Sequence, residues 1–307
     1  MYFKQRPLNQ SLISRFLYKG EEKQLICPKR TYCIDIVKTH HYRTESMLKG
    51  AFFETLCIGR GAGGKKVDDL PRKRLVKARE IENEHRKRQN LPEIKGEKTM
   101  DQIRIEQQAS RFKILSAKYQ ITVLDENTQV EIRVPWHKNP EIMLQGGFDI
   151  FPTAIITNDG LKMAIIDLKL TANVNAKFGE YCWGAPEFLD LIQVYMYHYI
   201  ARESIKNVAL NPHITELLTR PAVDLIKRNE LEFYYWVFNY KKEKLEDKLI
   251  KVVWDDKKEA EFHEAVRKCI SLIEYYEQLE WPAKPNYKLC KECTVFECTS
   301  RQTIQEI

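Results

Sequence analysis

The spacing of apolar residues predicts helices at the beginning, in the middle and at the end of the chain. Apolar positions three and four residues apart indicate amphipathic helices over 8–19, 44–59, 99–119, 185–204 and 256–280. A charged stretch over 68–90 has the composition of a solvent-exposed helix. The strands must therefore come from the segments between these helices.

Alternating or continuous apolar runs predict strands over 120–125, 129–134, 145–157, 161–171, 231–240 and 248–255. The third and fourth of these form one predicted hairpin, and the last two form another. Helices precede an antiparallel-rich sheet, and a helix, two strands and a final helix follow, which indicates a mixed α/β fold. We expect one domain, 1–307, with a charged helical insertion over 60–118.

The second strand of the first hairpin carries charges inside its most apolar run, "MAIIDLKL". Because side chains alternate between the two faces of a strand, one face is a continuous apolar row of Ala164, Ile166, Leu168 and Leu170. Asp167 and Lys169 share the other face. Two charged side chains on that face need a chemical or structural reason.

The turn "NDG" fits a three-residue hairpin loop that ends in a left-handed glycine. That register pairs Thr157 with Leu161 and places Asp149 opposite Lys169, with Asp167 on the diagonal. A proline three residues after Asp149 offers a bulge that would shift the register. Either way, the hairpin predicts two carboxylates and one ammonium in a single patch.

Such a patch suits a hard divalent cation. Two carboxylates held close together repel each other unless a cation joins them, and oxygen ligands favour Mg²⁺ or Mn²⁺. A bound metal lowers the pKa of a water and neutralises phosphate charge, and Lys169 would orient that water or stabilise the transition state. The alternative is a simple salt bridge between Lys169 and an aspartate.

Charge and composition add a polyanionic partner to this picture. The 307-residue chain has a net charge of +7 and is 43% hydrophobic, and its range 60–113 contains "GGKK", "PRKR" and "HRKR". This basic stretch indicates nucleic-acid contact, or else a solvated helix. No apolar run approaches the roughly 20 residues that span a bilayer. The first residues lack the apolar core of a signal peptide, so we expect a cytoplasmic protein without a membrane partner.

The hairpin acids resemble the PD-(D/E)xK nuclease superfamily: Asp149 stands in "GGFDIFP", and Asp167 and Lys169 stand in "IDLK". Two further segments resemble its RecB-like exonuclease branch. In "KGAFFETL" the metal-facing residue maps to Glu54, and "LIQVYMYHY" carries the Gln-x3-Tyr motif of that branch. Many RecB-like members have His where this chain has Glu54, whereas phage-type recombination exonucleases have Glu, which leaves the branch open.

The resemblance implies a restriction-endonuclease-like core that hydrolyses DNA as an exonuclease, on single strands or ends. It implies Mg²⁺ or Mn²⁺ ligands at Glu54, Asp149, Asp167 and the carbonyl of Leu168. Lys169 would assist the water, and Gln193 and Tyr197 would help to place the strand. A helicase, a recombinase or a CRISPR adaptation protein is the implied partner. The alternative is a nucleic-acid-binding or assembly subunit whose nuclease-like centre is inactive.

Three cysteines near the C-terminus, Cys290, Cys293 and Cys298, predict a metal site. Their alternative is a tail of reduced thiols. "CP" at 27–28 together with "CKECTVFEC" resembles the iron–sulfur members, namely the AddB-type nuclease domain and the CRISPR-associated RecB-like nucleases. The resemblance implies a structural [4Fe–4S] cluster, or Zn²⁺, with Cys27 as fourth ligand and Cys33 as its rival. A subdomain of 27–33 plus 281–298 would then staple the chain ends together. The remaining cysteines, Cys57, Cys182 and Cys269, are expected to be buried apolar residues.

Overall fold

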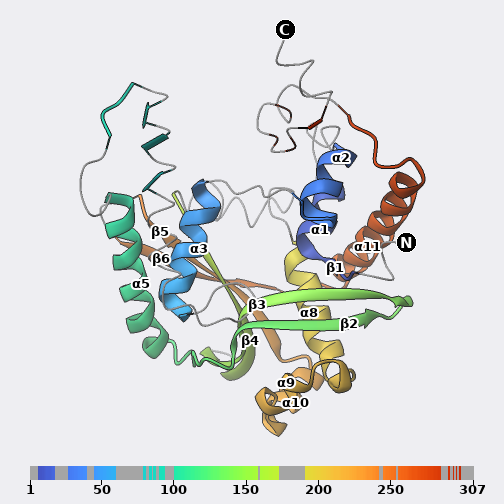
Figure 1. Cartoon of the computed structure of the whole chain (residues 1–307). Coiled ribbons are helices and arrows are strands. Elements are labelled where there is room, and N and C mark those ends of the chain that lie inside the picture. Colours follow the sequence, from blue (N-terminus) through green and yellow to red (C-terminus); the bar gives the residue numbers. More distant parts are fainter. Residues whose placement is uncertain are drawn as a thin grey trace.

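The computed structural model describes most of the chain. The described residues are 6–17, 27–39, 45–59, 79–80, 83–84, 86–87, 90–93, 100–157, 160–172, 191–241, 245–253, 255–284, 290, 293, 295 and 297–298. They form a mixed, curled sheet with helices on both faces (Figure 1). The α/β class expected from the sequence is therefore confirmed. Among the described helices, none has the length and apolar character needed to cross a membrane.

A long central strand organises the sheet. The strands are β1 (Leu8–Asn9), β2 (Thr128–Trp136), β3 (Asn139–Thr157), β4 (Gly160–Thr171), β5 (Leu231–Asn239) and β6 (Glu246–Val252). The first half of β3 pairs antiparallel with β2 and touches β1 in parallel, whereas its second half pairs antiparallel with β4. β5 runs parallel to β4, and β6 runs antiparallel to β5. Near Ile150, β3 exchanges β2 for β4 as its antiparallel partner. The point where β3 and β4 diverge is called the fork.

Helices cover both faces of this sheet. Their bounds are α1 (Gln10–Leu17), α2 (Pro28–Thr31), the π-helix η3 (Tyr32–Ile36), α3 (Glu45–Ile58), α5 (Met100–Lys118), α8 (Ile192–Ser204), the 3-10 helix η5 (Val208–Leu210), α9 (Pro212–Leu217), α10 (Arg220–Lys227) and α11 (Asp256–Gln278). α3 and α5 lie together on one side, and α1, α8 and α11 lie on the other (Figure 1). The candidate site residues come from both layers.

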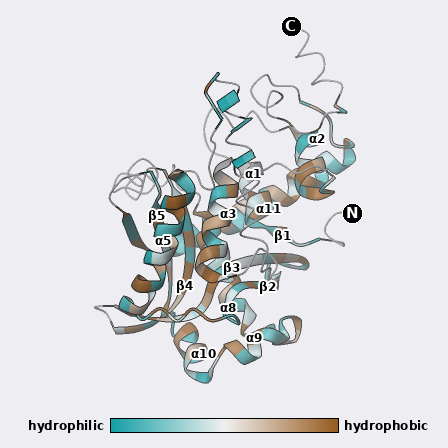
Figure 2. Ribbon diagram, turned by 60° about the vertical axis from the view of Figure 1, so that its left-hand side comes forward, coloured by the Kyte–Doolittle hydropathy of each residue, from teal (hydrophilic) through white to brown (hydrophobic). Residues whose placement is uncertain are grey.

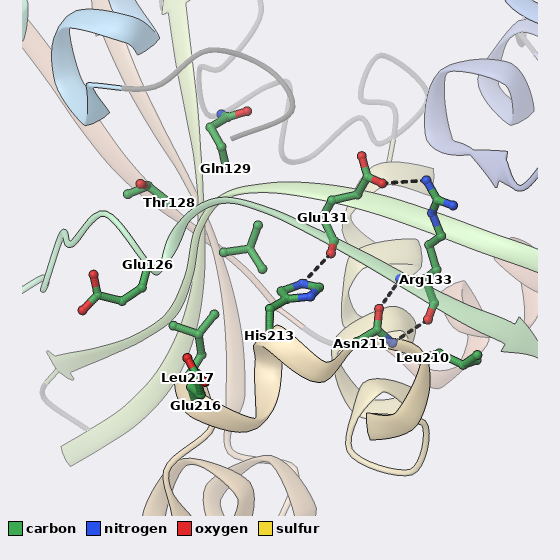
Figure 3. Close-up of a pocket in the computed structure, with 11 residues that line it drawn as sticks. Glu126, Thr128, Gln129, Glu131, Arg133, Leu210, Asn211, His213, Glu216 and Leu217 are labelled. Carbon is green, nitrogen blue, oxygen red and sulfur yellow. Dashed lines mark hydrogen bonds and ion pairs between the residues drawn. The ribbon is translucent and has the colours of Figure 1, made fainter. Parts of the chain in front are cut away.

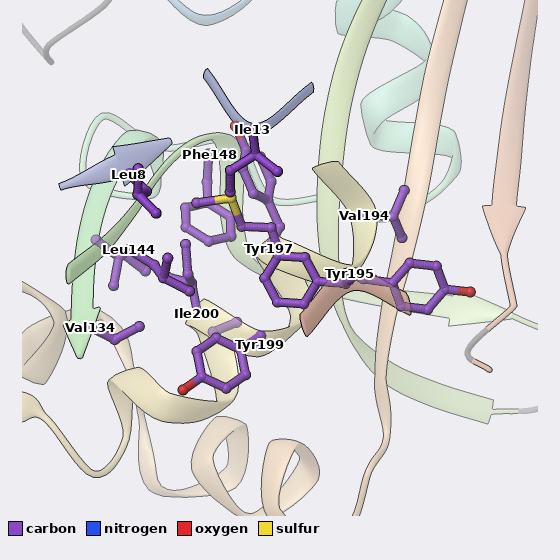
Figure 4. Packing of buried hydrophobic residues seen from close by; sticks show 14 of the residues in the cluster. Leu8, Ile13, Val134, Leu144, Phe148, Val194, Tyr195, Tyr197, Tyr199 and Ile200 are labelled. Carbon is purple, nitrogen blue, oxygen red and sulfur yellow. The ribbon is translucent and has the colours of Figure 1, made fainter. Parts of the chain in front are cut away.

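Each face of the sheet has its own apolar core. On the α8 side, the buried cluster includes Leu8, Ile13, Leu144, Phe148 and Ile200 (Figure 4). On the α3 side, aromatic rings dominate the cluster. There the Phe112 ring centroid lies 5.0 Å from that of Trp236, and the Phe53 centroid lies 4.9 Å from that of Phe238. These rings fix α3 and α5 on the sheet, because fully buried aromatic side chains supply the largest apolar areas.

The helix α5 belongs to the second core. Its buried apolar residues Ile105, Ala109, Phe112 and Leu115 recur at helical spacing and pack with Trp236. Figure 2 shows the apolar residues of α3 and α5 as brown patches on otherwise polar ribbons. The last 19 residues of the expected insertion, 60–118, therefore take part in core packing. Most of 60–99 lies outside the described residues.

Several predicted elements are confirmed and others are wrong. The helices over 44–59, 99–119 and 256–280 and both hairpins are confirmed, with shifted ends. The strand predicted over 120–125 is wrong, since a side chain takes the place of a partner strand: Thr122 donates its N–H to Thr153 Oγ1 at 3.1 Å, and its carbonyl accepts from the same hydroxyl at 3.1 Å. The segments 28–36 and 208–227, for which no element was predicted, contain short helices. Of the helix predicted over 185–204, the part from Ile192 onwards is described as α8, and Pro186 lies outside the described residues.

The hairpin register differs from the prediction. Thr157 pairs with Gly160 rather than with Leu161, which leaves two residues in the loop rather than three. A register shift between Ile150 and Thr153 then pairs Ile150 with Ile166. If this pairing is continued by one residue, Asp149, which precedes Ile150, lies level with Asp167, which follows Ile166, rather than with Lys169. The expected apolar face is confirmed, because the buried residues Ala164, Ile166 and Leu168 pack in the α3-side core.

Candidate active site

The fork between β3 and β4 brings the charged hairpin residues together. Asp149, on β3, accepts a hydrogen bond from the backbone N–H of Leu168 through Oδ2 at 2.7 Å. Leu168 stands between Asp167 and Lys169 on β4, so this bond fastens the first carboxylate beside the other two charges. The Leu168 N–H is available to this carboxylate because the hydrogen-bond ladder between β3 and β4 ends at the fork.

The helix α3 adds a third carboxylate from the opposite layer. Packing of Phe53 on Phe238 holds the helix over the sheet, and Glu54 is the next residue along it. The side-chain amide of Gln129, on β2, links the helix to the sheet. Its Nε2 donates to Glu54 Oε1 and, at 3.0 Å, to Asp149 Oδ1. Glu54 and Asp149 therefore face a common point from two elements.

The helix α8 holds the second aspartate from the other face. Gln193 Nε2 donates to Asp167 Oδ1 at 2.6 Å, and Tyr235 on β5 donates its hydroxyl to Gln193 Oε1 at 3.4 Å. Lys169 forms an ion pair with Asp167 Oδ2, and its ammonium lies 5.6 Å from the centre of the Tyr235 ring. The Asp167 side chain is 4% exposed and that of Lys169 is 33% exposed. Lys169 thus reaches from the buried carboxylate toward solvent.

Tyr197 lies beside the carboxylates, since burial and the charges of Asp167 and Asp149 together raise the pKa of its hydroxyl. It lies one helical turn after Gln193 on α8, but its hydroxyl donates to the carbonyl of Gly147 at 2.8 Å. Its ring is buried and packs 4.6 Å from that of Phe148, centroid to centroid. Tyr197 therefore anchors β3 two residues before Asp149 and also contacts Gln193, so its role in placing the strand stays a prediction.

The pKa values show that the four charged groups act on one another. Burial raises the pKa of Asp149 well above its usual range, and the charges of Glu54 and Asp167 raise it further. Burial also raises the pKa of Asp167, more than Lys169 and Gln193 lower it. For Lys169, burial alone would lower the pKa, but the three carboxylates outweigh burial and raise it. One ammonium among three carboxylates leaves the site short of positive charge.

The residue types at the fork fit a hard divalent cation, and their present spacing is wider than a bound ion requires. Within the described residues, no three His, Cys, Asp or Glu side chains are grouped tightly enough to hold a metal ion. The amide nitrogen of Gln129 lies between two of the carboxylates. An excess of buried negative charge on oxygen ligands is nevertheless the electrostatic environment that Mg²⁺ and Mn²⁺ favour.

Gln129 is the site residue that sequence reasoning missed. Alternation along β2 places its side chain with those of Glu131 and Arg133, away from the core. Its backbone has φ of +51°, a left-handed conformation that costs a non-glycine residue roughly 1 kcal/mol. The neighbouring pairs, Thr128 with Ile150 and Val130 with Phe148, put Gln129 directly across from Asp149. No signal in the sequence indicates this conformation.

A surface cavity of about 820 Å³ is lined by residues of β2, including Gln129, and by residues of η5 and α9 (Figure 3). It separates β2 from η5 and α9, and it contains the carboxylates of Glu126, Glu131 and Glu216. Asn211 fills the role of a neighbouring strand at its edge, since its side chain bonds both the N–H and the carbonyl of Arg133 at 2.9 and 2.7 Å. Asn211 therefore satisfies two backbone groups of β2 beside the cavity.

The predicted cluster cysteines gather at the end of the α1–α11 layer. Cys33 and Cys293 form a small buried cluster, with Cys298 packed against it. Burial raises the pKa of the Cys293 thiol, and Cys27 and Cys290 contribute to the increase. The N-terminal segment that carries Cys27 and Cys33 is joined to the segment after α11 by a hydrogen bond from the Lys29 N–H to the Pro282 carbonyl at 3.2 Å. Cys27 and Cys33 are both near the C-terminal cysteines, so both stay candidates for the fourth ligand.

The remaining cysteines are apolar core residues where they are described. Cys57 and Cys269 are buried, and Cys182 lies outside the described residues. Burial raises the pKa of both described thiols. Neither belongs to the cysteine cluster.

Comparisons with known proteins identify no family for this chain. No protein-family model matches this chain, and neither does any curated protein.

Proposed function

We propose that this protein is a divalent-metal-dependent DNA nuclease of the PD-(D/E)xK type, acting as an exonuclease on single strands or ends. The observation that carries the proposal is the meeting of Glu54, Asp149, Asp167 and Lys169 at the fork of the sheet. These residues are spread from position 54 to position 169 of the chain, and three separate elements, α3, β3 and β4, supply them. A structural salt bridge needs two opposite charges, whereas this site gathers three carboxylates around one ammonium.

Glu54, Asp149, Asp167 and the carbonyl of Leu168 would hold Mg²⁺ or Mn²⁺. When bound, the ion lowers the pKa of a water and neutralises charge on the phosphate. The protein side chains supply the rest of the site. Gln193 orients the Asp167 carboxylate, and Tyr197 holds the backbone before Asp149. Lys169, one third exposed at the rim, can contact the phosphate or orient the attacking water.

The alternative class is a nucleic-acid-binding subunit with an inactive centre. That class does not need the orientation of Asp167 by Gln193, nor an ammonium held among three carboxylates. Binding alone is served by exposed basic residues, because phosphate contacts are chiefly electrostatic. The arrangement at the fork therefore favours hydrolysis over binding.

The test is cleavage of end-labelled single- and double-stranded DNA with Mn²⁺ and with EDTA. We expect cleavage with Mn²⁺ alone, and a loss of more than about 100-fold in Asp167→Asn and in Lys169→Met. Lys162→Met is the matched control, because Lys162 lies on the same strand beside the hairpin turn and pairs with Ile155. Tight DNA binding by the wild type without Mn²⁺-dependent cleavage would favour the inactive class instead.

A further inference from the structure

Gln129 makes the contacts that a cation would make at the fork. A side-chain NH₂ group has two hydrogens, and Gln129 directs its nitrogen at both Glu54 Oε1 and Asp149 Oδ1. Hydrogen bonds from a donor to ionised carboxylates are the strong kind, and here they join two groups that otherwise repel. The amide thus offsets part of the negative charge while carrying no net charge itself.

Gln129 makes this contact from an unusual backbone conformation. A strand residue directly opposite Asp149 has its side chain on the same face of the sheet as that carboxylate, and Gln129 keeps this position with a left-handed φ of +51°. Residues held in sparsely populated conformations cluster at functional sites, where the surrounding structure maintains them. In Figure 3 the side chain points away from His213 and Leu217, which lie on the cavity side of β2.

We infer that Gln129 is a positioning residue that holds Glu54 and Asp149 together in the metal-free protein and gives way when a divalent cation binds. The inference rests on the proposed function, because it needs a cation that uses both carboxylates. An ion bonded to Glu54 Oε1 and Asp149 Oδ1 would need the space that the amide nitrogen now fills. Metal binding and the two hydrogen bonds are therefore in competition.

This competition sets the metal affinity. When the cation binds to the wild type, the hydrogen bonds of Gln129 to two charged groups are lost, and a variant without the amide has none to lose. A hydrogen bond to a charged group corresponds to at least a factor of about ten in an equilibrium constant. Removal of the amide should therefore make Mn²⁺ bind about tenfold more tightly, although a merely structural residue would leave the affinity unchanged or weaken it.

The experiment is calorimetric titration of Mn²⁺ into the full chain, for the wild type, Gln129→Leu and Gln129→Gly. Leu removes the amide and keeps the bulk, and Gly also removes the cost of the left-handed backbone. We expect both variants to bind Mn²⁺ about tenfold more tightly than the wild type does. Both variants should also unfold at lower denaturant in EDTA than in Mn²⁺, and this difference in unfolding midpoint should be larger than that of the wild type. Gln145→Leu, on β3 four residues before Asp149, is the control and should bind as the wild type does.

The outcomes separate the inference from the proposed function. Equal or weaker Mn²⁺ binding in both variants, with a cleaving wild type, overturns the role of Gln129 and leaves the nuclease proposal standing. A wild type that neither binds Mn²⁺ nor cleaves DNA overturns the nuclease proposal, and the inference falls with it. Tighter binding in the variants, together with cleavage at saturating Mn²⁺, supports both.

Discussion

A buried carboxylate between two lysines fixes the helix that carries Glu54. Asp101, at the start of α5, lies 2.6 Å from the ammonium of Lys49 on α3 and 2.9 Å from that of Lys241 after β5. The Lys49 and Asp101 side chains are each 8% exposed, whereas the Lys241 side chain is 49% exposed. We predict that Asp101→Asn is strongly destabilising, because it leaves the Lys49 ammonium buried without its carboxylate.

The difference in exposure sets the expected magnitudes. Removal of one partner of a buried ion pair costs about 3–5 kcal/mol, so Asp101→Asn should lower the free energy of unfolding by that amount. Lys241→Met should cost less than about 1 kcal/mol, since exposed pairs contribute little. The double variant Asp101→Asn with Lys49→Met should regain at least about 1 kcal/mol, because no uncompensated buried charge remains.

The assay is urea unfolding at neutral pH, followed by circular dichroism. Arg133→Gln is the matched control, because Arg133 pairs with Glu131 where both side chains are about half exposed, at 53% and 45%. That variant should stay within about 1 kcal/mol of the wild type. If Asp101→Asn is no more destabilising than Arg133→Gln, or if the double variant is less stable than Asp101→Asn, the reasoning is refuted.

The pH dependence of the same residue has a defined sign. Burial alone would raise the pKa of Asp101, but hydrogen bonds and charge from Lys241 and Lys49 outweigh burial and lower it. A carboxylate with a lowered pKa in the folded state stabilises the protein above its unfolded pKa of about 3.9 and loses that effect as the pH falls through the folded value. The gap between the wild type and Asp101→Asn should therefore close in acid.

Two further predictions concern regions away from the fork. His263 accepts a hydrogen bond from Trp136 Nε1 at 3.0 Å through Nδ1, and burial, with the charges of His137, Lys138 and Arg202, lowers its pKa to about 4. Because the unfolded histidine binds its proton near pH 6.5, this residue should cost stability as the pH falls from about 6.5 to 4, and His263→Asn should flatten that part of the urea-unfolding profile. For the cysteine cluster, anaerobically purified protein should contain iron with visible absorbance, or zinc without it, and Cys293→Ser should lose the metal and unfold more easily. Metal-free protein with unchanged stability would leave the cysteines as ordinary thiols.

The parts of the fold that depend on local patterns could be predicted from the sequence. The apolar face of Ala164, Ile166 and Leu168 follows from the two-residue period of a strand, and the structure packs that face in one core. The placement of Gln193 near Asp167 rests on the resemblance and not on a local pattern. Its hydrogen bond to Asp167 agrees with that expectation, although the roles themselves stay predictions.

The parts that depend on distant contacts could not be predicted. The sequence allows a bulge at Pro152, and the register shift lies there, between Ile150 and Thr153, but its extent depends on β3 exchanging one partner strand for another. The left-handed backbone of Gln129 is a conformation that strand periodicity does not predict. The choice between Cys27 and Cys33 depends on how two ends of the chain meet. In each case, residues far apart in the sequence determine the local geometry.

In the proposed nuclease, Glu54, Asp149 and Asp167 share one divalent cation. Calorimetric titration of Mn²⁺ into Glu54→Gln, Asp149→Asn and Asp167→Asn tests it most directly, because each substitution removes one negative charge and changes little else in size. We expect one Mn²⁺ per wild-type chain and binding at least about tenfold weaker in every variant. Wild-type affinity in any one of the three would contradict it.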